Sequence, residues 1–340
     1  MADDSRRDIL KKAAALGLAA IASTQDALAR TERLSEQADR PAGQTDQRAA
    51  TADFFPGFKR LTKQTSGATI NFVTAGSGPP LLLMHGYPET HLMWRKVAPQ
   101  LAKKFTVVAA DLRGYGDSSK PAGGGDHAAY SKRAMAQDQV EVMNSLGFQK
   151  FLVVGHDRGG RVAHRLALDH SDSVQKLVVL DIVPTYKVFH TVTKELATSN
   201  FHWFFLIQPE PLPETMIGNS AEFWLKSRFN GLPRGAIGKE AFAEYLRSFR
   251  TPEMIHATCE DYRAGASIDL MHDDTDLQRK ISCPVLALWA ERGAMHRQYN
   301  VLDTWKERAS NVVGKPLPSS HFIAEEIPEM LLSELGNFLG

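Results

Sequence analysis

The sequence predicts an α/β fold, with a mostly parallel sheet, helices on both faces of the sheet and an inserted helical cap. From Phe54 onward, short β-rich runs alternate with amphipathic helical stretches, which is typical of parallel sheets flanked by helices. A glycine-flanked turn near residue 157 joins an apolar run to a helix. About a hundred residues after Asp181 lack a strand pattern, and this is too long for an unstructured loop.

Seven runs have the composition of β-strands, and several are almost continuously apolar, as expected of strands that are covered on both faces. They span residues 70–75, 81–85, 106–111, 151–155, 177–181, 285–289 and, more weakly, 312–317. Helical spacing is found in residues 90–103, 131–146 and 161–169. The alternation of the two patterns favours a parallel sheet rather than an antiparallel one.

The alternation stops between residues 181 and 281, where aromatic residues recur with helical spacing. We expect a helical cap over residues 184–269. The α/β core is then expected to consist of residues 52–183 and 270–340.

The composition excludes several classes of protein. With 43% apolar and 23% charged residues the chain is expected to fold, and a net charge of +1 gives no general reason to bind nucleic acid. The chain has no phosphate-binding loop, dinucleotide fingerprint or zinc-ligand spacing, so we expect no cofactor and no metal. Cys259 and Cys283 form no disulfide framework and are expected to be free, buried thiols.

Residues 1–29 have the pattern of a bacterial twin-arginine export signal. Arg6 and Arg7 precede a mildly apolar run over residues 13–22, and residues 27–29 (ALA) match a signal-peptidase site. The run is about half of the ~20 residues that span a bilayer, so we expect no stable membrane anchor. The expected partner is the twin-arginine export machinery and the expected location is the periplasm. An amphipathic N-terminal helix is the alternative.

Residues 30–51 are polar and show no apolar period, so they are expected to form a flexible linker.

The segment Gly155-His156-Asp157-Arg158-Gly159 lies where an apolar strand meets a helix. This is the context of a nucleophile elbow, where small flanking residues permit a sharp strand-to-helix turn. The central position usually holds Ser and here holds Asp. The alternative is that Asp157 only caps the following helix, which is a frequent role of Asp.

A carboxylate at the elbow restricts the reaction. A Ser that displaced a leaving group from an alkyl carbon would become an ether, which water cannot readily cleave. A carboxylate that makes the same displacement becomes an ester, and activated water can attack its carbonyl. Asp157 therefore favours substitution at sp3 carbon, such as cleavage of carbon–halogen bonds or epoxides.

The other catalytic groups are predicted from their positions along the chain. The backbone amides of Tyr87, in a loop after a strand, and of Arg158 are expected to form an oxyanion hole. His321 follows the last predicted strand and is the expected general base. Asp181 is favoured over Glu291 as the acid that orients it, which gives a triad in the order nucleophile, acid, base.

Seven segments together resemble the haloacetate (fluoroacetate) dehalogenases of the α/β-hydrolase superfamily: HGYP, DLRGYGDSSKP, GHDRGGRVAHRLALDH, LDIVPTY, FHWFFLIQPEPLPE, CEDYRAG and SSHF. The resemblance runs from about Phe54 to the C-terminus. It implies an α/β-hydrolase fold and the hydrolysis of small 2-haloacids, such as haloacetate, to a 2-hydroxy acid and halide through an aspartyl ester.

By position, the resemblance implies that Arg158 and Arg161 bind the substrate carboxylate. Their spacing agrees with this role, because residues three apart on a helix share one face. Guanidinium groups pair well with carboxylates, and a helix N-terminus favours an anion. The resemblance also implies a halide pocket, with N–H or O–H donors supplied by His202, Trp203 and Tyr262.

Leu232 departs from the family pattern, which has a Trp near this position. If that Trp normally closes the acid-binding chamber, a wider pocket is expected here. The alternatives to dehalogenation are an epoxide hydrolase with the same Asp–His–Asp groups and a non-catalytic binding protein built on the fold. The sequence does not fix the oligomeric state, and a homodimer is one arrangement compatible with it.

Overall fold

The structure of the protein is a computed structural model that describes residues 53–340. The predicted export signal (residues 1–29) and linker (residues 30–51) lie outside the described residues. Within residues 53–340, no helix combines the length and apolar character that crossing a bilayer requires.

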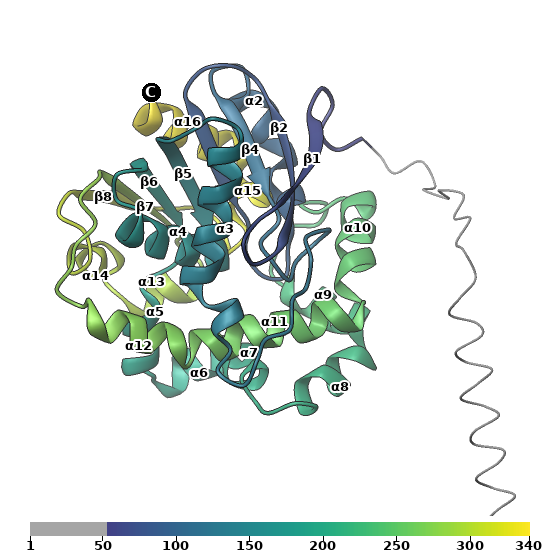
Figure 1. Ribbon diagram of the computed structural model, residues 1–340. Helices are drawn as coiled ribbons and strands as arrows, with labels where there is room; N and C mark the ends of the chain where they lie inside the picture. Colours follow the sequence, from purple (N-terminus) through teal and green to yellow (C-terminus); the bar gives the residue numbers. More distant parts are fainter. Residues whose placement is uncertain (1–52) are drawn as a thin grey trace, which may run out of the picture. The chain divides into compact units, whose positions relative to one another are not determined.

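The centre of the described chain is an eight-stranded sheet with the order β1-β2-β4-β3-β5-β6-β7-β8 (Figure 1). The strands are β1 (Lys59–Gln64), β2 (Thr69–Ala75), β3 (Pro80–Met84), β4 (Thr106–Ala110), β5 (Phe151–His156), β6 (Val174–Leu180), β7 (Val285–Ala290) and β8 (Val312–Leu317). The pairs β1–β2 and β2–β4 are antiparallel, and all other pairs are parallel. The predicted mostly parallel sheet is confirmed, and each of the seven predicted strands is present.

The structure adds one strand that the sequence pattern did not show. β1 (KRLTKQ) lies at the edge of the sheet, and five of its six residues are exposed. A solvated edge strand has no apolar face, so hydrophobic alternation cannot mark it, and its charges protect it from pairing with other chains.

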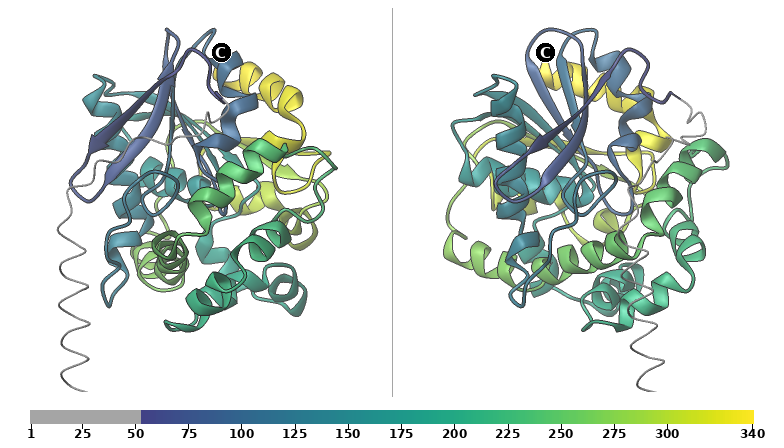
Figure 2. Two further views of the ribbon diagram at one scale, coloured as in Figure 1. Left: turned by 90° about the vertical axis from the view of Figure 1, so that its right-hand side faces the viewer. Right: turned by 45° about the vertical axis from the view of Figure 1, so that its right-hand side comes forward.

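Helices cover both faces of the sheet (Figure 2). One face carries α3 (Lys132–Ser145) and α4 (Asp157–Asp169), and α4 packs on β5 and β6. The other carries η1 (His91–Lys96), α2 (Ala98–Leu101), α15 (Ile323–Glu326) and α16 (Pro328–Leu339). Near β7 and β8 lie α13 (Ala294–Gln298) and α14 (Val301–Lys306), and a further 3-10 turn, η2, spans Ala128–Tyr130.

The helix predicted over residues 90–103 is replaced by two short elements. Thr90 caps η1 through its side chain, and the chain continues as 3-10 helix only to Lys96. Pro99 lies in the first turn of α2, where its missing N–H is tolerated, so the boundary falls before it.

The region between β6 and β7 is helical, which confirms the predicted cap. It contains α5 (Thr185–His190), α6 (Lys194–Ser199), α7 (Phe201–Leu206), α8 (Leu212–Gly218), α9 (Ala221–Arg228), α10 (Lys239–Phe249), α11 (Pro252–Gly265) and α12 (Ile268–Thr275). These helices lie across the end of the sheet where the parallel strands finish (Figure 1). Ligands of open α/β sheets bind at the carboxyl ends of the strands, so the cap covers the position expected for a site.

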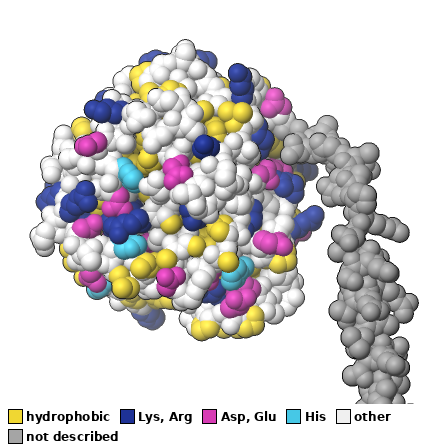
Figure 3. Space-filling view, in the orientation of Figure 1, with side chains coloured by type: hydrophobic (Ala, Val, Ile, Leu, Met, Phe, Trp, Pro, Cys, Tyr) yellow, Lys and Arg dark blue, Asp and Glu magenta, His cyan; other side chains and the backbone are white. Residues whose placement is uncertain are grey.

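Cys259 is buried and Cys283 is partly exposed, and neither is in a disulfide. Both thiols are therefore free, but only one is fully buried. On the face shown in Figure 3, Lys and Arg side chains are interspersed with Asp and Glu.

Candidate active site

Asp157 lies at the junction of β5 and α4 in a left-handed backbone conformation, with φ of 44°. Residues other than glycine rarely adopt this backbone conformation, and it persists only where the surrounding structure enforces it. The turn depends on close approach: a Cβ on Gly159 would lie 2.4 Å from the carbonyl oxygen of His85, and one on Gly86 would lie 2.5 Å from Cβ of Asp157. The sharp turn of a nucleophile elbow is therefore present.

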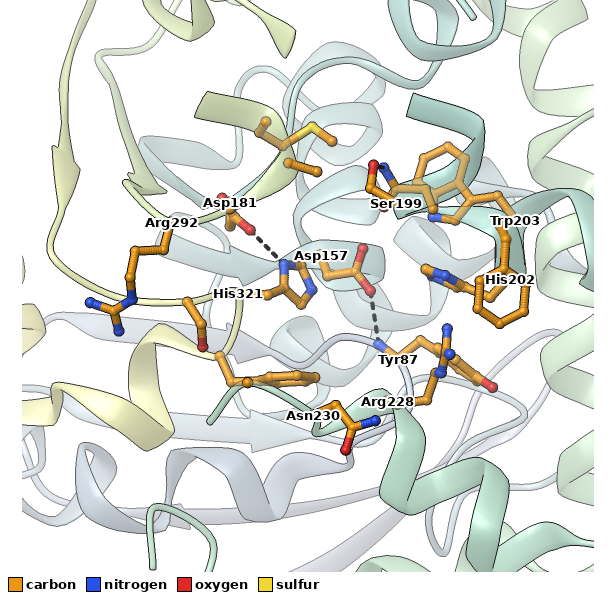
Figure 4. A pocket seen from close by; sticks show the side chains of 18 of the residues that line it. Tyr87, Asp157, Asp181, Ser199, His202, Trp203, Arg228, Asn230, Arg292 and His321 are labelled. Atoms are coloured by element: carbon orange, nitrogen blue, oxygen red, sulfur yellow. Dashed lines mark hydrogen bonds and ion pairs between the residues drawn. The ribbon is translucent and has the colours of Figure 1, made fainter. Parts of the chain in front are cut away.

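The Asp157 carboxylate does not act only as a cap of its own helix. Its Oδ2 accepts a hydrogen bond from the backbone N–H of Tyr87 at 3.0 Å, so it contacts a loop from another strand (Figure 4). This N–H is one of the two amides predicted to form the oxyanion hole. The other, that of Arg158, belongs to the residue that follows Asp157.

His321 and Asp181 form a hydrogen-bonded pair beside Asp157 (Figure 4). His321 Nδ1 lies 2.6 Å from Asp181 Oδ2, and Asp181 Oδ1 accepts the N–H of Ala290 at 2.9 Å. Asp181 directly follows β6 and has a φ of 51°. Glu291, the alternative acid, has an exposed side chain. The acid that contacts His321 is therefore Asp181.

The surroundings set the charges of these groups. Burial opposes ionisation of Asp157, but the positive charges of His321 and Arg161 outweigh it and lower its pKa. Burial also opposes protonation of His321, but the hydrogen bond and the charge of Asp181 prevail, and the pKa of His321 is raised above 6.5. Asp157 is thus held as a carboxylate, and His321 is held as a stronger base than free imidazole.

His156 and Glu89 are buried beside His321, and sequence reasoning did not identify Glu89. His156 Nε2 bonds to the carbonyl oxygen of His321 at 2.9 Å, and its Nδ1 lies 3.5 Å from Glu89 Oε2. Burial, together with the neighbouring His321, lowers the pKa of His156 to about 4. Burial and the charge of Glu325 raise the pKa of Glu89 well above its ordinary value. A neutral imidazole thus supports the loop that carries His321.

Arg161 is the predicted carboxylate ligand that faces the cavity. It lies on α4 one turn after Asp157, and one Nη bonds to the carbonyl oxygen of Val183 and to Thr185 Oγ1, both at 3.0 Å. Its buried Nε has no partner among the described residues. Burial lowers the pKa of Arg161 to about 10, so the guanidinium stays charged at neutral pH.

The Arg158 side chain lies elsewhere. Its guanidinium is buried and bonds to both carboxylate oxygens of Asp261 on α11, at 2.8 and 2.7 Å. It also stacks over the Tyr262 ring at 4.1 Å and is not among the residues that line the cavity. To bind a substrate carboxylate, Arg158 would have to release part of this ion pair.

The three predicted halide ligands come together on the cap side of Asp157. His202 and Trp203 are consecutive residues of α7 that line the cavity, and their rings lie 5.9 and 6.0 Å from the Tyr262 ring. The Tyr262 hydroxyl and His202 Nδ1 are buried and have no hydrogen-bond partner among the described residues. Buried polar groups are nearly always satisfied, so both atoms are candidate ligand contacts, and of the two residues His202 lines the cavity.

A cavity of about 540 Å³ lies between the sheet and the cap. Its lining includes Asp157, Arg161, Asp181, His202, Trp203, Arg228 and His321. Leu232 does not line it but contributes to a separate surface groove with Phe229 and Phe242. Among residues 53–340 no cluster of His, Cys, Asp or Glu is arranged to hold a metal ion.

Comparison with known proteins places this geometry in a family. The family described as alpha/beta hydrolase fold matches residues 79–327. The chain is 47% identical over 290 residues to a fluoroacetate dehalogenase of Burkholderia sp, covering 84% of this chain and 95% of that protein. It is 36% identical over 277 residues to a soluble epoxide hydrolase of Corynebacterium sp. (strain C12), covering 78% of this chain and 92% of that protein.

A crystal structure of a protein described as an α/β hydrolase from Nostoc sp PCC 7120 is similar with a TM-score of 0.82 and 58% identity, over 83% of this chain and 98% of that one. The extent of these matches agrees with the sheet order, the elbow at Asp157 and the cap. The chain belongs to the α/β-hydrolase family.

Proposed function

We propose that this protein hydrolyses the carbon–halogen bond of small 2-haloacids through an ester on Asp157. The observation that carries the proposal is the elbow carboxylate, which accepts the Tyr87 amide at 3.0 Å and lies beside the His321–Asp181 pair. A carboxylate in this position suits displacement at an alkyl carbon. The 47% identity to a fluoroacetate dehalogenase supports the choice of a haloacid.

In the first step, the cationic Arg161 orients the carboxylate of the substrate. Asp157 Oδ attacks the halogen-bearing carbon from the side opposite the halogen, so a C–O bond forms as the C–halogen bond breaks. The electron pair of that bond leaves with the halide, which accepts hydrogen bonds from His202, Trp203 and Tyr262. Arg158 adds positive charge behind Tyr262 and serves as a second carboxylate ligand if its contact with Asp261 opens.

In the second step, His321 removes a proton from water, and the hydroxide attacks the Asp157 ester carbonyl. The negative oxygen that develops is stabilised by the amides of Tyr87 and Arg158. Asp181 stabilises the imidazolium and fixes its orientation. When the intermediate collapses, the C–O bond to the substrate breaks and the leaving oxygen takes the proton from the His321 imidazolium, which releases the 2-hydroxy acid. The new carboxyl group of Asp157 then loses its proton to solvent, which regenerates the carboxylate.

Epoxide hydrolysis is the second candidate, and one observation favours it. The Tyr262 hydroxyl is buried without a partner among the described residues and could protonate an epoxide oxygen. The chain also resembles an epoxide hydrolase at 36% identity. Against this, the cavity presents the cationic Arg161 and Arg228, which suit an acid better than a neutral epoxide.

Halide release from fluoro-, chloro- and bromoacetate, measured beside the hydration of styrene oxide, tests the proposal. We expect turnover of haloacetates and little of the epoxide. Preferential hydration of the epoxide would establish the second candidate. Turnover of none of these compounds would favour a binding protein built on the fold.

We also propose that the protein is exported to the periplasm through the twin-arginine pathway, on the pattern around Arg6 and Arg7. Replacing both arginines by lysine is expected to retain the protein in the cytoplasm. Unchanged recovery from the periplasm would contradict the export proposal, and it would leave the proposed reaction unaffected.

A further inference from the structure

The cavity contains a cation that the proposed reaction does not use. Arg228, the last residue of α9, lines the same cavity as Asp157 and Arg161, and in Figure 4 its guanidinium extends toward His202. The guanidinium packs over the rings of Phe201 and Trp224, with 4.7 and 4.9 Å to the ring centroids. It is therefore held by aromatic contacts from the cap and not by an acid.

No carboxylate among the described residues pairs with Arg228. The only hydrogen bond of its guanidinium in the described part of the chain is a long contact of 3.3 Å from Nε to Ser227 Oγ. Burial lowers the pKa of Arg228, but it remains a cation at neutral pH. Arg228 is partly buried and lines the cavity with no acid beside it, so its guanidinium is free to pair with an anion that binds there.

The charges of the residues that line the cavity also indicate an anionic ligand. Asp181 is paired with His321, and Arg292 at the rim is paired with Glu326. Arg161 and Arg228 then line a cavity with a single free carboxylate, that of Asp157, while the exposed Arg297 lies at the rim. A monoanionic acid held by Arg161 would leave the positive charge of Arg228, on the cap side of the cavity, without a partner.

The size of the cavity supports a larger ligand than haloacetate. Its volume of about 540 Å³ lies within the range of pockets that hold drug-sized ligands, so a two-carbon acid fills only a small part of it. The cap side of the cavity thus offers both free volume and the unpaired cation Arg228.

We propose that Arg228 forms a second anion subsite and that the substrates include 2-haloacids with a second carboxylate, such as 2-halosuccinates. The inference rests on the proposed dehalogenation. One carboxylate of the diacid binds Arg161, and the other binds Arg228 across the cavity. The bonds formed and broken at Asp157 are those of the reaction above, so Arg228 determines specificity and takes no part in the chemical steps.

Chloride release from 2-chlorosuccinate and 2-chlorobutyrate tests the subsite, because these acids have the same chain length and differ in the second carboxylate. Each enantiomer is assayed, and chloroacetate serves as a reference. We expect wild-type kcat/KM to favour the diacid and Arg228→Gln to lower the diacid-to-monoacid ratio about tenfold or more, the loss expected for a charge-assisted hydrogen bond.

Two variants control for general effects. Arg297→Gln removes a positive charge from the exposed rim of the same cavity, and it should change the ratio little. Arg228→Lys retains the charge and should retain most of the diacid preference, provided that thermal unfolding shows it to be folded. An equal loss for all three acids in Arg228→Gln, or an unchanged ratio, would overturn the subsite.

Equilibrium binding separates this inference from the proposed reaction. Wild-type protein is titrated with succinate and with butyrate, neither of which can react. Tighter binding of succinate that is lost in Arg228→Gln supports the subsite even if no halide is released from any acid. Equal affinities of wild-type protein for the two acids would contradict it even if chloroacetate is turned over.

Discussion

The two walls of the cavity differ in how their polar groups are satisfied. On the sheet wall, Asp157 accepts the Tyr87 amide, and Asp181 bonds to both His321 and the Ala290 amide. On the cap side, His202 Nδ1, in the wall, and the Tyr262 hydroxyl, beside it, have no partner among the described residues. Apart from Arg161 Nε, which also lacks a partner, the sheet wall is held by its own hydrogen bonds, whereas these groups of the cap are not.

Backbone strain follows the same division. Asp157 and Asp181 both have positive φ at the ends of adjacent strands, and among the described residues no non-glycine residue of the cap does. Such conformations cost about 1–3 kcal/mol each and persist where neighbouring structure enforces them. The buried strands β5 and β6 supply that support for the two aspartates. The cap instead places His202, Trp203 and Arg228 on the short helices α7 and α9.

The largest expected effect comes from removing the base on the sheet wall. In His321→Gln we expect the first step to continue and ester hydrolysis to stop, so that steady-state turnover falls on the order of 10³-fold or more. Mass spectrometry of protein mixed with chloroacetate should show the peptide of Asp157 heavier by one carboxymethyl group. If the variant loses turnover but never accumulates this adduct, His321 does not act on an ester.

On the cap wall, Tyr262→Phe should have a smaller and more selective effect. Loss of one hydrogen bond to the leaving halide is expected to reduce turnover roughly 10–100-fold. The reduction should be greater for fluoroacetate than for bromoacetate, because fluoride is the poorer leaving group. Rates of halide release from fluoroacetate and from bromoacetate measure the two reductions.

Tyr130→Phe is the matched control, because its buried ring carries a hydroxyl that already bonds to the Pro121 carbonyl oxygen away from the cavity. An equal loss for both halides in Tyr262→Phe would assign the Tyr262 hydroxyl a structural role.

A smaller effect is expected of pH on the rate of ester hydrolysis. Ester hydrolysis requires neutral His321, so its rate should rise with pH and level off above the raised pKa of this residue. Asp181→Asn removes the negative charge that helps to raise the pKa of His321, so the rising limb should move to lower pH. Single-turnover rates between pH 5 and 9 measure this limb.

The lowered pKa of Asp157 keeps it ionised over that range, so the alkylation step should stay constant with pH. If the rising part of the pH–rate profile stays at the same pH in Asp181→Asn, the group that titrates is not His321.

The sheet wall could largely be predicted from the sequence, because its signals are local. Apolar runs end directly at Asp157 and Asp181, and parallel strands bring their carboxyl ends to one edge. β1 could not be predicted in this way, because an exposed edge strand such as Lys59–Gln64 carries no apolar period.

The cap wall could be predicted only in part. The bond from Arg158 to Asp261 joins residues 103 positions apart, and no sequence spacing indicates it. Arg228 looks like an ordinary basic residue at the end of a helix, where such residues are common. Only the packing of the cap shows that it faces the cavity. Long-range contacts between cap and core decide which arginine meets a ligand.

The ester on Asp157 can be tested by a single turnover of chloroacetate in heavy-oxygen water, with enzyme in excess. We expect heavy oxygen to enter the carboxylate of Asp157, detected by mass analysis of its peptide, and glycolate from this first turnover to be unlabelled. Asp157→Asn should release no chloride, provided that the asparagine has not deamidated. Label in the first glycolate with none in the peptide would show direct attack by water and would contradict the ester on Asp157.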